Sequence, residues 1–528
     1  MEYRNYQKKA ISAVINEWNN GNRKTLLVLP TGMGKTVCFA GVAKQCVSSN
    51  LKVLVIAHRE ELIQQARAKI SAITGIDTGI ERASDSAAGS NYPIIVGSMH
   101  TLQRMRRLKR YPKDFFGAVI IDEAHHVMSD GYQRILNYFD NPYVLGVTAT
   151  PYRGDKKTLT KYFDSIAYEC TLIDGIKGGY LSNIIVKQVP IGIDITNVST
   201  KKGDYEAGQV GRAIEPYLEE IADSMIDCCK GRKHIVVFTP LIATSQKFCE
   251  ILNSKGFSAC EVNASTKNRG EILSDFENGR YNVLCNAMLL TEGWDCPPVD
   301  CVINLRPTKL IGLYMQMIGR GTRPSPGTGK ENLLVLDFLW QTSGVDLCRP
   351  ASLVAKDIEH RKRMNKILTS GGAADLSELS EQAERDILAE REESMRKKLA
   401  LNSRNSSRTF DVIEFINSIG DYDLSNYSPL FGWEREPATE KQIQLLRNYG
   451  FKATGGMSKG LASAIISKSI ERAHEGKCTP KQLHRLNMFG FTNVSEWTFK
   501  QASDMIGAIA DSGWQIPPGV DPLTYRPN

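Results

Sequence analysis

Short apolar runs recur along the first part of the chain, and stretches with helical spacing of apolar residues lie between them. The runs are rich in Val, Ile and Leu and cover residues 25–29, 51–57, 93–98, 117–122 and 143–148. The intervening stretches, such as 35–48 and 60–73, have the period of amphipathic helices. Strands that read as continuous apolar runs are buried on both faces, as in a parallel sheet covered by helices. This part therefore predicts a buried parallel sheet.

The same alternation begins again after a break. The second set of runs covers residues 234–239, 258–262, 282–286, 300–305 and 333–338. Between the two sets, residues 197–211 lack apolar periodicity and predict a surface excursion before a helix at 215–229. The pattern predicts an α/β chain with two tandem parallel-sheet domains, at 1–170 and 171–350.

The last third of the chain has a different, helical character. Residues 351–409 are mostly charged and helix-prone, and predict a helical extension that ends in a linker. Residues 410–528 contain a repeat, in which the pattern of 439–451 returns at 479–491. Each copy starts with a threonine able to cap a helix and ends in glycine, where helices stop. We expect a small module of paired helices.

Composition narrows the class of protein. The 528 residues are 42% hydrophobic and 23% charged, as in ordinary soluble domains. No apolar run approaches the roughly 20 residues of a membrane span, and residues 1–7 are polar, so a cytoplasmic location without membrane contact is expected. The twelve cysteines are scattered, which favours reduced thiols. Of the net charge of +8, residues 1–354 carry 42 basic against 35 acidic side chains, so contacts with a phosphate backbone are expected there.

The first run with chemical potential is Leu29–Thr36, which reads Leu-Pro-Thr-Gly-Met-Gly-Lys-Thr after a predicted strand. Gly32 and Gly34 would let backbone amides approach phosphates, Lys35 would reach the β and γ phosphates, and Thr36 would ligate magnesium. The strict phosphate-loop pattern begins with glycine, whereas this run begins with leucine. A tight strand-to-helix turn without a ligand is therefore the alternative.

A second run places two carboxylates, Asp122 and Glu123, at the end of a buried strand. A carboxylate there is costly unless a charged group meets it, and Mg²⁺ bound to ATP is a natural partner. We therefore expect Asp122 to bind magnesium together with Thr36, and Glu123 to position or deprotonate the attacking water.

A third run, Gln316-x-x-Gly319-Arg320-x-x-Arg323, places two guanidinium groups about one helical turn apart. Phosphoryl transfer gains most from a cation delivered to the γ-phosphate, so Arg320 and Arg323 would complete the first domain's site. The alternative is a surface helix with solvated arginines.

The order of these motifs resembles the superfamily 2 helicases and translocases, in the branch with a DEAH-type box that includes RadD-like repair helicases and restriction-enzyme motor subunits. The resemblance covers roughly residues 3–340. Its motifs are Arg4–Gln7, Leu29–Thr36, Ala57–Leu62, Gly97–Leu102, Asp122–His125, Thr148–Thr150, Val237–Thr239, Thr291–Pro297 and Gln316–Arg323.

The resemblance implies two RecA-like domains, with ATP and Mg²⁺ in the cleft between them and nucleic acid across their tops. It implies that Arg323 is the arginine finger, that Arg320 also contacts the γ-phosphate, and that Asp295 lies near the ribose. The implied nucleotide contacts are Gln7, Thr31, Gly32, Gly34, Lys35, Thr36, Gly293 and Asp295; the implied catalytic residues are Lys35, Asp122, Glu123, Gln316, Arg320 and Arg323; and the implied strand contacts are Arg59, Thr101 and Thr291.

Together these observations predict an ATP-dependent DNA helicase or translocase of low sequence specificity, acting in repair, recombination or replication. The alternatives are a motor subunit of a restriction or defence complex and an ATP-dependent DNA-binding switch; an RNA helicase is less favoured, because the resemblance is to the repair and restriction branch. The basic run 104–113 would hold a phosphate backbone or form a solvated helix face. The near-neutral repeats would bind a partner protein or branched DNA, and their aromatic residues are expected in a core rather than stacked on bases.

Overall fold

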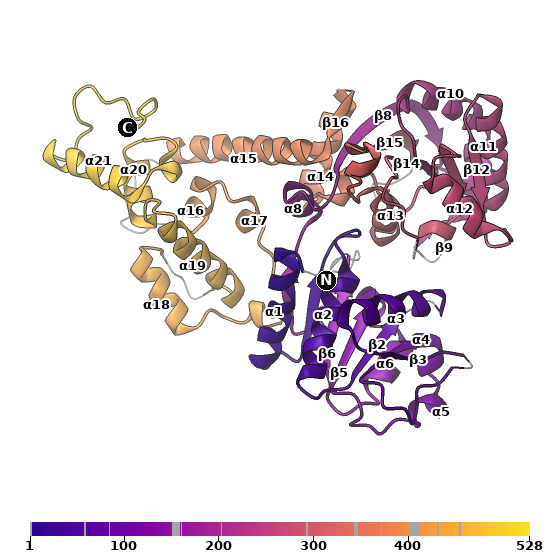
Figure 1. Ribbon diagram of the computed structural model, residues 1–528. Coiled ribbons are helices and arrows are strands. Elements are labelled where there is room, and N and C mark those ends of the chain that lie inside the picture. The colour runs from indigo at the N-terminus through magenta and orange to yellow at the C-terminus, as the bar shows by residue number, and fades with distance from the viewer. Residues whose placement is uncertain are drawn as a thin grey trace. The chain divides into compact units, whose positions relative to one another are not determined.

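The computed structural model describes most of the chain: residues 3–57, 60–83, 85–149, 159, 161–201, 203–291, 294–342, 347–370, 372–401, 412–429, 432–452 and 456–527. The chain forms two compact units, Met1–Glu381 and Gln382–Asn528, and the boundary falls within one long helix, α15 (Leu376–Leu401). Figure 1 shows the chain from its indigo N-terminus to its yellow C-terminus. Within the described residues, none of the helices combines the length and apolar character needed to cross a membrane.

The first domain of the larger unit is built on a parallel sheet, in the order β3-β4-β2-β5-β6-β1-β7. Its strands are β1 (Lys24–Val28), β2 (Val53–Ala57), β3 (Thr78–Glu81), β4 (Ile94–Ser98), β5 (Ala118–Asp122), β6 (Tyr143–Thr148) and β7 (Ser165–Glu169). Its helices are α1 (Asn5–Asn19), α2 (Lys35–Ser48), α3 (Glu60–Thr74), α4 (Met99–Leu102), α5 (Met105–Leu108) and α6 (Asp130–Leu136). Strands β2, β4 and β5 are buried almost throughout, as their apolar runs predict.

The second domain of this unit repeats the design around a sheet in the order β12-β13-β11-β14-β15-β8-β16. Its strands are β8 (Asn183–Asp194), β11 (Ile235–Phe238), β12 (Ala259–Val262), β13 (Val283–Asn286), β14 (Cys301–Asn304), β15 (Asn332–Gln341) and β16 (Ala373–Asp375), of which β16 alone pairs antiparallel among them. Its helices include α8 (Leu172–Lys177), α9 (Ala207–Ile214), α10 (Leu218–Cys228), α11 (Ile242–Ser254), α12 (Arg269–Glu277), α13 (Ile311–Ile318) and α14 (Ile358–Ser370). The predicted α/β fold with two parallel-sheet domains is confirmed.

Several elements of the second domain differ from the sequence prediction, among them β16, which pairs with β8 although the stretch 351–409 was predicted to be a helical extension. Strand β8 was not predicted, because polar side chains interrupt its apolar positions after Val186, yet it pairs with β15 over ten positions. The predicted surface excursion 197–211 contains a hairpin of β9 (Thr200–Lys201) and β10 (Asp204–Tyr205). Asp204 is buried there and accepts hydrogen bonds from Thr308 Oγ1 at 2.9 Å and from the Lys309 amide at 2.8 Å. The excursion is therefore anchored to the segment that leads into α13.

The smaller unit is helical, and its predicted repeat is two equivalent helix pairs. The helices are α16 (Val412–Ser418), α17 (Tyr422–Ser425), α18 (Glu440–Tyr449), α19 (Lys459–His474), α20 (Pro480–Met488) and α21 (Phe499–Asp511). Thr439 and Thr479 cap α18 and α20 in the same way. Gln442 Nε2 donates to Ser463 Oγ at 2.8 Å, and its counterpart Gln482 donates to Ser503 Oγ at 2.7 Å. Identical bonds forty residues apart show that the repeat is structural.

The repeat aromatics belong to the core of this unit. Phe451 and Phe491 are 2% and 4% exposed, and Tyr449 and Phe489 pack against the same cluster. This confirms the expectation that these four side chains build a helix-pair core.

Candidate functional site

The predicted phosphate loop is the turn that joins β1 to α2. Gly32 and Gly34 have φ values of +93° and +69°, a region that residues with a Cβ rarely adopt, and α2 begins directly afterwards at Lys35. The hydroxyl of Thr31 is buried and has no hydrogen-bond partner in the described part of the chain. A glycine cradle at a helix N-terminus beside an unsatisfied hydroxyl suits a bound phosphate group.

Helix α1 is fastened to this loop. Tyr6 Oη donates a hydrogen bond to the Met33 carbonyl at 2.6 Å, and the next residue, Gln7, is 5% exposed. A Cβ added at Gly34 would lie 3.1 Å from Gln7 Nε2, so the amide of Gln7 lies beside the loop. This position is compatible with the predicted contact between Gln7 and a nucleotide base, which stays a prediction.

The two predicted carboxylates lie at the end of β5, opposite the lysine of the loop. Asp122 Oδ1 accepts a hydrogen bond from the Glu123 amide at 3.0 Å, and Glu123 has a left-handed backbone with φ of +52°. Glu123 Oε1 lies 3.8 Å from Lys35 Nζ, and its Oε2 lies 3.2 Å from His125 Nδ1. The structure therefore brings Lys35 and Glu123 together from segments almost ninety residues apart, and leaves Thr36 in the first turn of α2.

The surroundings of Glu123 keep it ionised. Burial by itself would raise the pKa of Glu123, but the charge of Lys35 and the hydrogen bond with His125 outweigh burial and lower this pKa to about 2. Glu123 is thus a carboxylate at neutral pH, the form that can accept a proton from water.

The loop that follows α13 meets the phosphate loop from the second domain. Thr322 Oγ1 donates to the Thr31 carbonyl at 3.3 Å, and a Cβ added at Gly319 would lie 2.6 Å from Thr31 Cβ. A Cβ at Gly32 would lie 3.0 Å from Thr322 Oγ1 and 3.5 Å from Arg323 Cγ. The side chain of Arg323 therefore lies against the glycine that begins the cradle.

The guanidinium groups of this loop contact the segment 291–297 of the same domain. Arg320 Nη2 donates to the Thr291 carbonyl at 2.6 Å, and its Nη1 donates to the Trp294 carbonyl. Arg323 forms an ion pair with Asp295. The structure thus brings together four predicted site residues, Thr291, Asp295, Arg320 and Arg323, and the charged side chains among them contact other protein groups. Gln316 lies half-buried on α13, and Gly293 lies outside the described residues.

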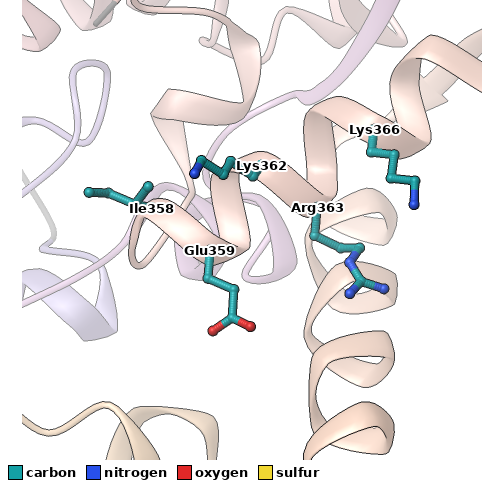
Figure 2. Close-up of a pocket in the computed structure, with 5 residues that line it drawn as sticks. All are labelled: Ile358, Glu359, Lys362, Arg363 and Lys366. Atoms are coloured by element: carbon teal, nitrogen blue, oxygen red, sulfur yellow. The ribbon is translucent and has the colours of Figure 1, made fainter. Parts of the chain in front are cut away.

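Two hollows mark this unit, and they differ in place and size. The hollow where the two domains meet is about 20 Å³, close to the size of one water molecule, and is lined by Pro30, Thr31, Leu172, Met315, Ile318, Gly319, Thr322 and Leu353. A larger surface hollow of about 450 Å³ runs along α14 and is lined by Ile358, Glu359, Lys362, Arg363 and Lys366 (Figure 2). Lys35, Thr36, Asp122 and Glu123 line neither of these two hollows.

The predicted strand contacts present little side-chain surface. Thr101 is 5% exposed and accepts a hydrogen bond from the Ala83 amide, and Thr291 is 1% exposed and donates to the Met288 carbonyl at 2.9 Å. Arg59 lies outside the described residues. Contact between these three residues and a strand stays a prediction.

A buried carboxylate that sequence reasoning missed organises the basic run 104–113. Glu81 is fully buried; Arg107 Nη1 lies 2.7 Å from its Oε1, and Tyr111 Oη donates to its Oε2 at 2.7 Å. Arg107 is therefore structural, whereas the run's exposed cations are Arg104, Arg106, Lys109, Arg110 and Lys113. The only signal for this network in the sequence was a single acidic residue, Glu81, at the end of the short strand β3.

Comparison with known proteins agrees with this geometry. Residues 1–153 match the family described as the res subunit of type III restriction enzymes, and residues 218–325 match the helicase conserved C-terminal domain. The two matches occur in the order of a helicase core and include the phosphate loop, the Asp122–Glu123 pair and both arginines. The resemblance to the superfamily 2 helicases is confirmed to this extent, because the chain carries both parts of a helicase core.

Relatives of this chain come from eukaryotes and bacteria. It is 30% identical to the candidate ATP-dependent helicase IRC3 of Saccharomyces cerevisiae in an alignment of 362 positions, which covers 64% of this chain and 52% of the relative. It is 26% identical to the EcoAI type I restriction endonuclease subunit of Escherichia coli, over 63% of this chain and 46% of the relative. The chain thus spans about half the length of these relatives.

Solved structures support the fold. A fragment of a candidate HsdR subunit of a type I restriction enzyme from Vibrio vulnificus has a TM-score of 0.51 at 22% identity, and covers 64% of each chain. The ATP-dependent type ISP restriction-modification enzyme LlaBIII has a TM-score of 0.55 at 14% identity, over 97% of this chain and 40% of that one.

Proposed function

We propose that this helicase is an ATP-driven DNA motor, which hydrolyses ATP between its two RecA-like domains and moves along or remodels DNA. One observation carries the proposal: Arg323 of the second domain lies against Gly32 of the phosphate loop, beside the Lys35–Glu123 pair. An arginine delivered by the second domain would make hydrolysis depend on domain closure, and such a dependence couples ATP turnover to movement in a motor.

Each residue of the site has a defined task in this proposal. The amides around Gly32 and Gly34 and the ammonium of Lys35 would hold the phosphates, while Thr36 and Asp122 would hold the Mg²⁺ that accompanies ATP. Mg²⁺ would neutralise charge on the phosphate oxygens. Glu123, which is ionised, accepts the proton of the attacking water.

Closure changes the partner of Arg323. Its guanidinium leaves Asp295 and turns to the γ-phosphate, where a cation stabilises the charge of the transition state. Arg320 links the same loop to the Thr291 and Trp294 carbonyls, so displacement of the arginine loop also displaces the segment predicted to contact the strand. This linkage is our candidate for the coupling between hydrolysis and movement.

DNA is the proposed substrate, held through its backbone with low sequence specificity. Arg59, Thr101 and Thr291 are the proposed strand contacts, and the exposed cations of the 104–113 run would add electrostatic attraction. The restriction-enzyme relatives and the DNA-processing branch that the motifs resemble support DNA over RNA. A role in repair, recombination or replication is part of the proposal.

The test is an ATPase assay across single-stranded, duplex, forked and four-way DNA, with RNA in parallel. We expect DNA to stimulate turnover, and Lys35→Ala and Glu123→Gln to abolish it while the circular dichroism spectrum is retained. Turnover that no DNA stimulates would overturn the proposal, and stimulation by RNA alone would redirect it.

The second candidate is a motor subunit of a restriction or defence complex, in which the helical repeats bind a partner protein. The match to the restriction res subunit favours this candidate. Displacement of a triplex-forming strand without separation of a forked duplex would support a translocating motor, whereas separation of the fork would support a helicase.

A further inference from the structure

The ammonium group of Lys330 binds the backbone of the arginine loop, the loop after α13 that carries Arg320 and Arg323. Its Nζ donates to the Gly321 carbonyl at 2.6 Å, to the Arg323 carbonyl at 2.6 Å and to the Pro297 carbonyl at 3.1 Å. The lysine is half-buried in the turn that precedes β15. Its three ammonium hydrogens thus have three backbone acceptors, two from the loop and one from segment 291–297.

Burial of the Lys330 ammonium group costs free energy, and this cost indicates that the residue has a specific task. Burial disfavours the charged form and lowers the pKa of Lys330 to about 8, and the nearby Asp300 offsets part of this effect. A buried ammonium is tolerated when its donors are satisfied, and three convergent carbonyls satisfy all of them. A side chain without a hydrogen-bond donor would leave these three carbonyls unpaired, so lysine suits this position.

Lys330 differs from the other two cations that join the same segments. Arg320 and Arg323 reach from the loop to segment 291–297 with their side chains, and Arg323 must leave Asp295 when it meets the γ-phosphate. The bonds of Lys330 go to backbone carbonyls and involve no group that a nucleotide would claim. They are therefore able to persist while Arg323 changes partner.

We propose that Lys330 is a positioning residue, which fixes the backbone of the arginine loop so that Arg323 reaches the γ-phosphate in the correct orientation. The inference rests on the proposed function, because it gives the arginine loop its catalytic task. It predicts that loss of Lys330 impairs the chemical step and leaves the binding of ADP intact.

Lys330→Met tests this, because methionine keeps the length of the side chain and removes the donors. Lys309→Met is the matched control: Lys309 is a half-buried lysine of the same domain whose Nζ lies over the Tyr205 ring, 5.1 Å from its centroid. We expect kcat of DNA-stimulated hydrolysis to fall roughly 10- to 100-fold in Lys330→Met, because small displacements of a catalytic group have effects of that order. The KM for ATP and the affinity for ADP should not change, whereas the affinity for ADP with beryllium fluoride should fall.

Hydrogen exchange supplies a readout that does not depend on turnover. Amides of residues 319–325 should exchange faster in Lys330→Met than in the wild type and in Lys309→Met, with the sheet unchanged. Unchanged exchange in this loop, or wild-type kcat, would overturn the inference. Wild-type protein without DNA-stimulated hydrolysis would overturn the proposed function, while the exchange measurement would still report whether Lys330 holds the loop.

A second variant covers the case in which Lys330→Met does not fold. Lys330→Arg keeps the charge, but its planar guanidinium cannot direct donors from one point to three carbonyls. We expect a folded protein with lowered kcat and unchanged KM. Wild-type kcat in this variant would contradict the three-carbonyl geometry as a requirement.

Discussion

Arg323 forms an ion pair with Asp295 while its side chain lies against Gly32, so the proposed arginine finger stands at the phosphate loop with its charge held by its own domain. In the proposed mechanism, ATP competes with Asp295 for this guanidinium. The ion pair then opposes domain closure, and removal of the Asp295 carboxylate should make closure easier.

Asp295→Asn tests the threshold. We expect hydrolysis without DNA to rise, because Arg323 no longer has to leave a carboxylate before it meets the γ-phosphate. The measurement is kcat with and without DNA, and the ratio of the two should shrink. A fall of both values with an unchanged ratio would instead indicate that Asp295 contacts the nucleotide directly.

The titration of Lys330 gives a pH signature. Its pKa is about 8, below the ordinary lysine value, so the ammonium is present below pH 8 and is lost as pH rises through that value. The groups that act on it are Asp300, Cys296 and Arg232. We expect kcat to decline as pH rises through about 8, and this decline to be absent from Lys330→Met.

Folding stability should move in the opposite direction over the same range. Between pH 8 and the ordinary lysine pKa, the unfolded chain binds a proton at Lys330 that the folded chain has released. The contribution of Lys330 to the free energy of unfolding therefore increases as pH rises. If stability falls together with kcat as pH rises, the decline of kcat has an origin other than the titration of Lys330.

Glu81→Gln tests whether the buried Glu81–Arg107 pair supports DNA stimulation. Removal of one partner of a buried ion pair costs about 3 to 5 kcal/mol. Arg107 would lose its carboxylate partner here and keep its bond to the Ala83 carbonyl. The Ala83 amide beside this pair donates to Thr101, a proposed strand contact. We expect lower stability to urea and weaker DNA stimulation, with unchanged affinity for ADP. Full stimulation in a folded variant would separate this network from the DNA contact.

Gly34→Ala tests the cradle of the phosphate loop. Gly34 has φ of +69°, and a Cβ there would lie 3.1 Å from Gln7 Nε2, so alanine strains the backbone and displaces Gln7. We expect ATP affinity to fall severely while the secondary structure is retained, measured by fluorescent nucleotide titration and circular dichroism. Gly256→Ala, at a positive φ with open space around it, is the control for backbone strain alone.

The sequence predicted the buried elements well, because their signal is local. Strand β2 and helix α2 stand where the apolar run and the helical period placed them, and the Lys35–Glu123 proximity follows from the parallel topology. Strand β8 was missed because polar side chains interrupt its apolar pattern.

The interactions that tune the site were not predictable in the same way. Lys330 bonds to backbone carbonyls, which leave no mark in a sequence, and the partner of Glu81 lies twenty-six residues away on another element. The Arg320 and Arg323 pattern suggested two contacts with the γ-phosphate, whereas the structure gives both guanidiniums partners in segment 291–297. The sequence shows which charged residues are present, and the packing within each domain decides which groups they contact.

The most direct test of the split site is kcat of DNA-stimulated ATP hydrolysis in Arg323→Ala. Arg212→Ala, an exposed arginine on α9 of the same domain, is the control. An arginine finger contributes about 10³-fold or more to kcat, so a loss of that order with retained ATP binding is the predicted result, and Arg212→Ala should match the wild type. Wild-type turnover in Arg323→Ala would contradict the account, because the second domain would then add nothing to the chemistry at Lys35 and Glu123.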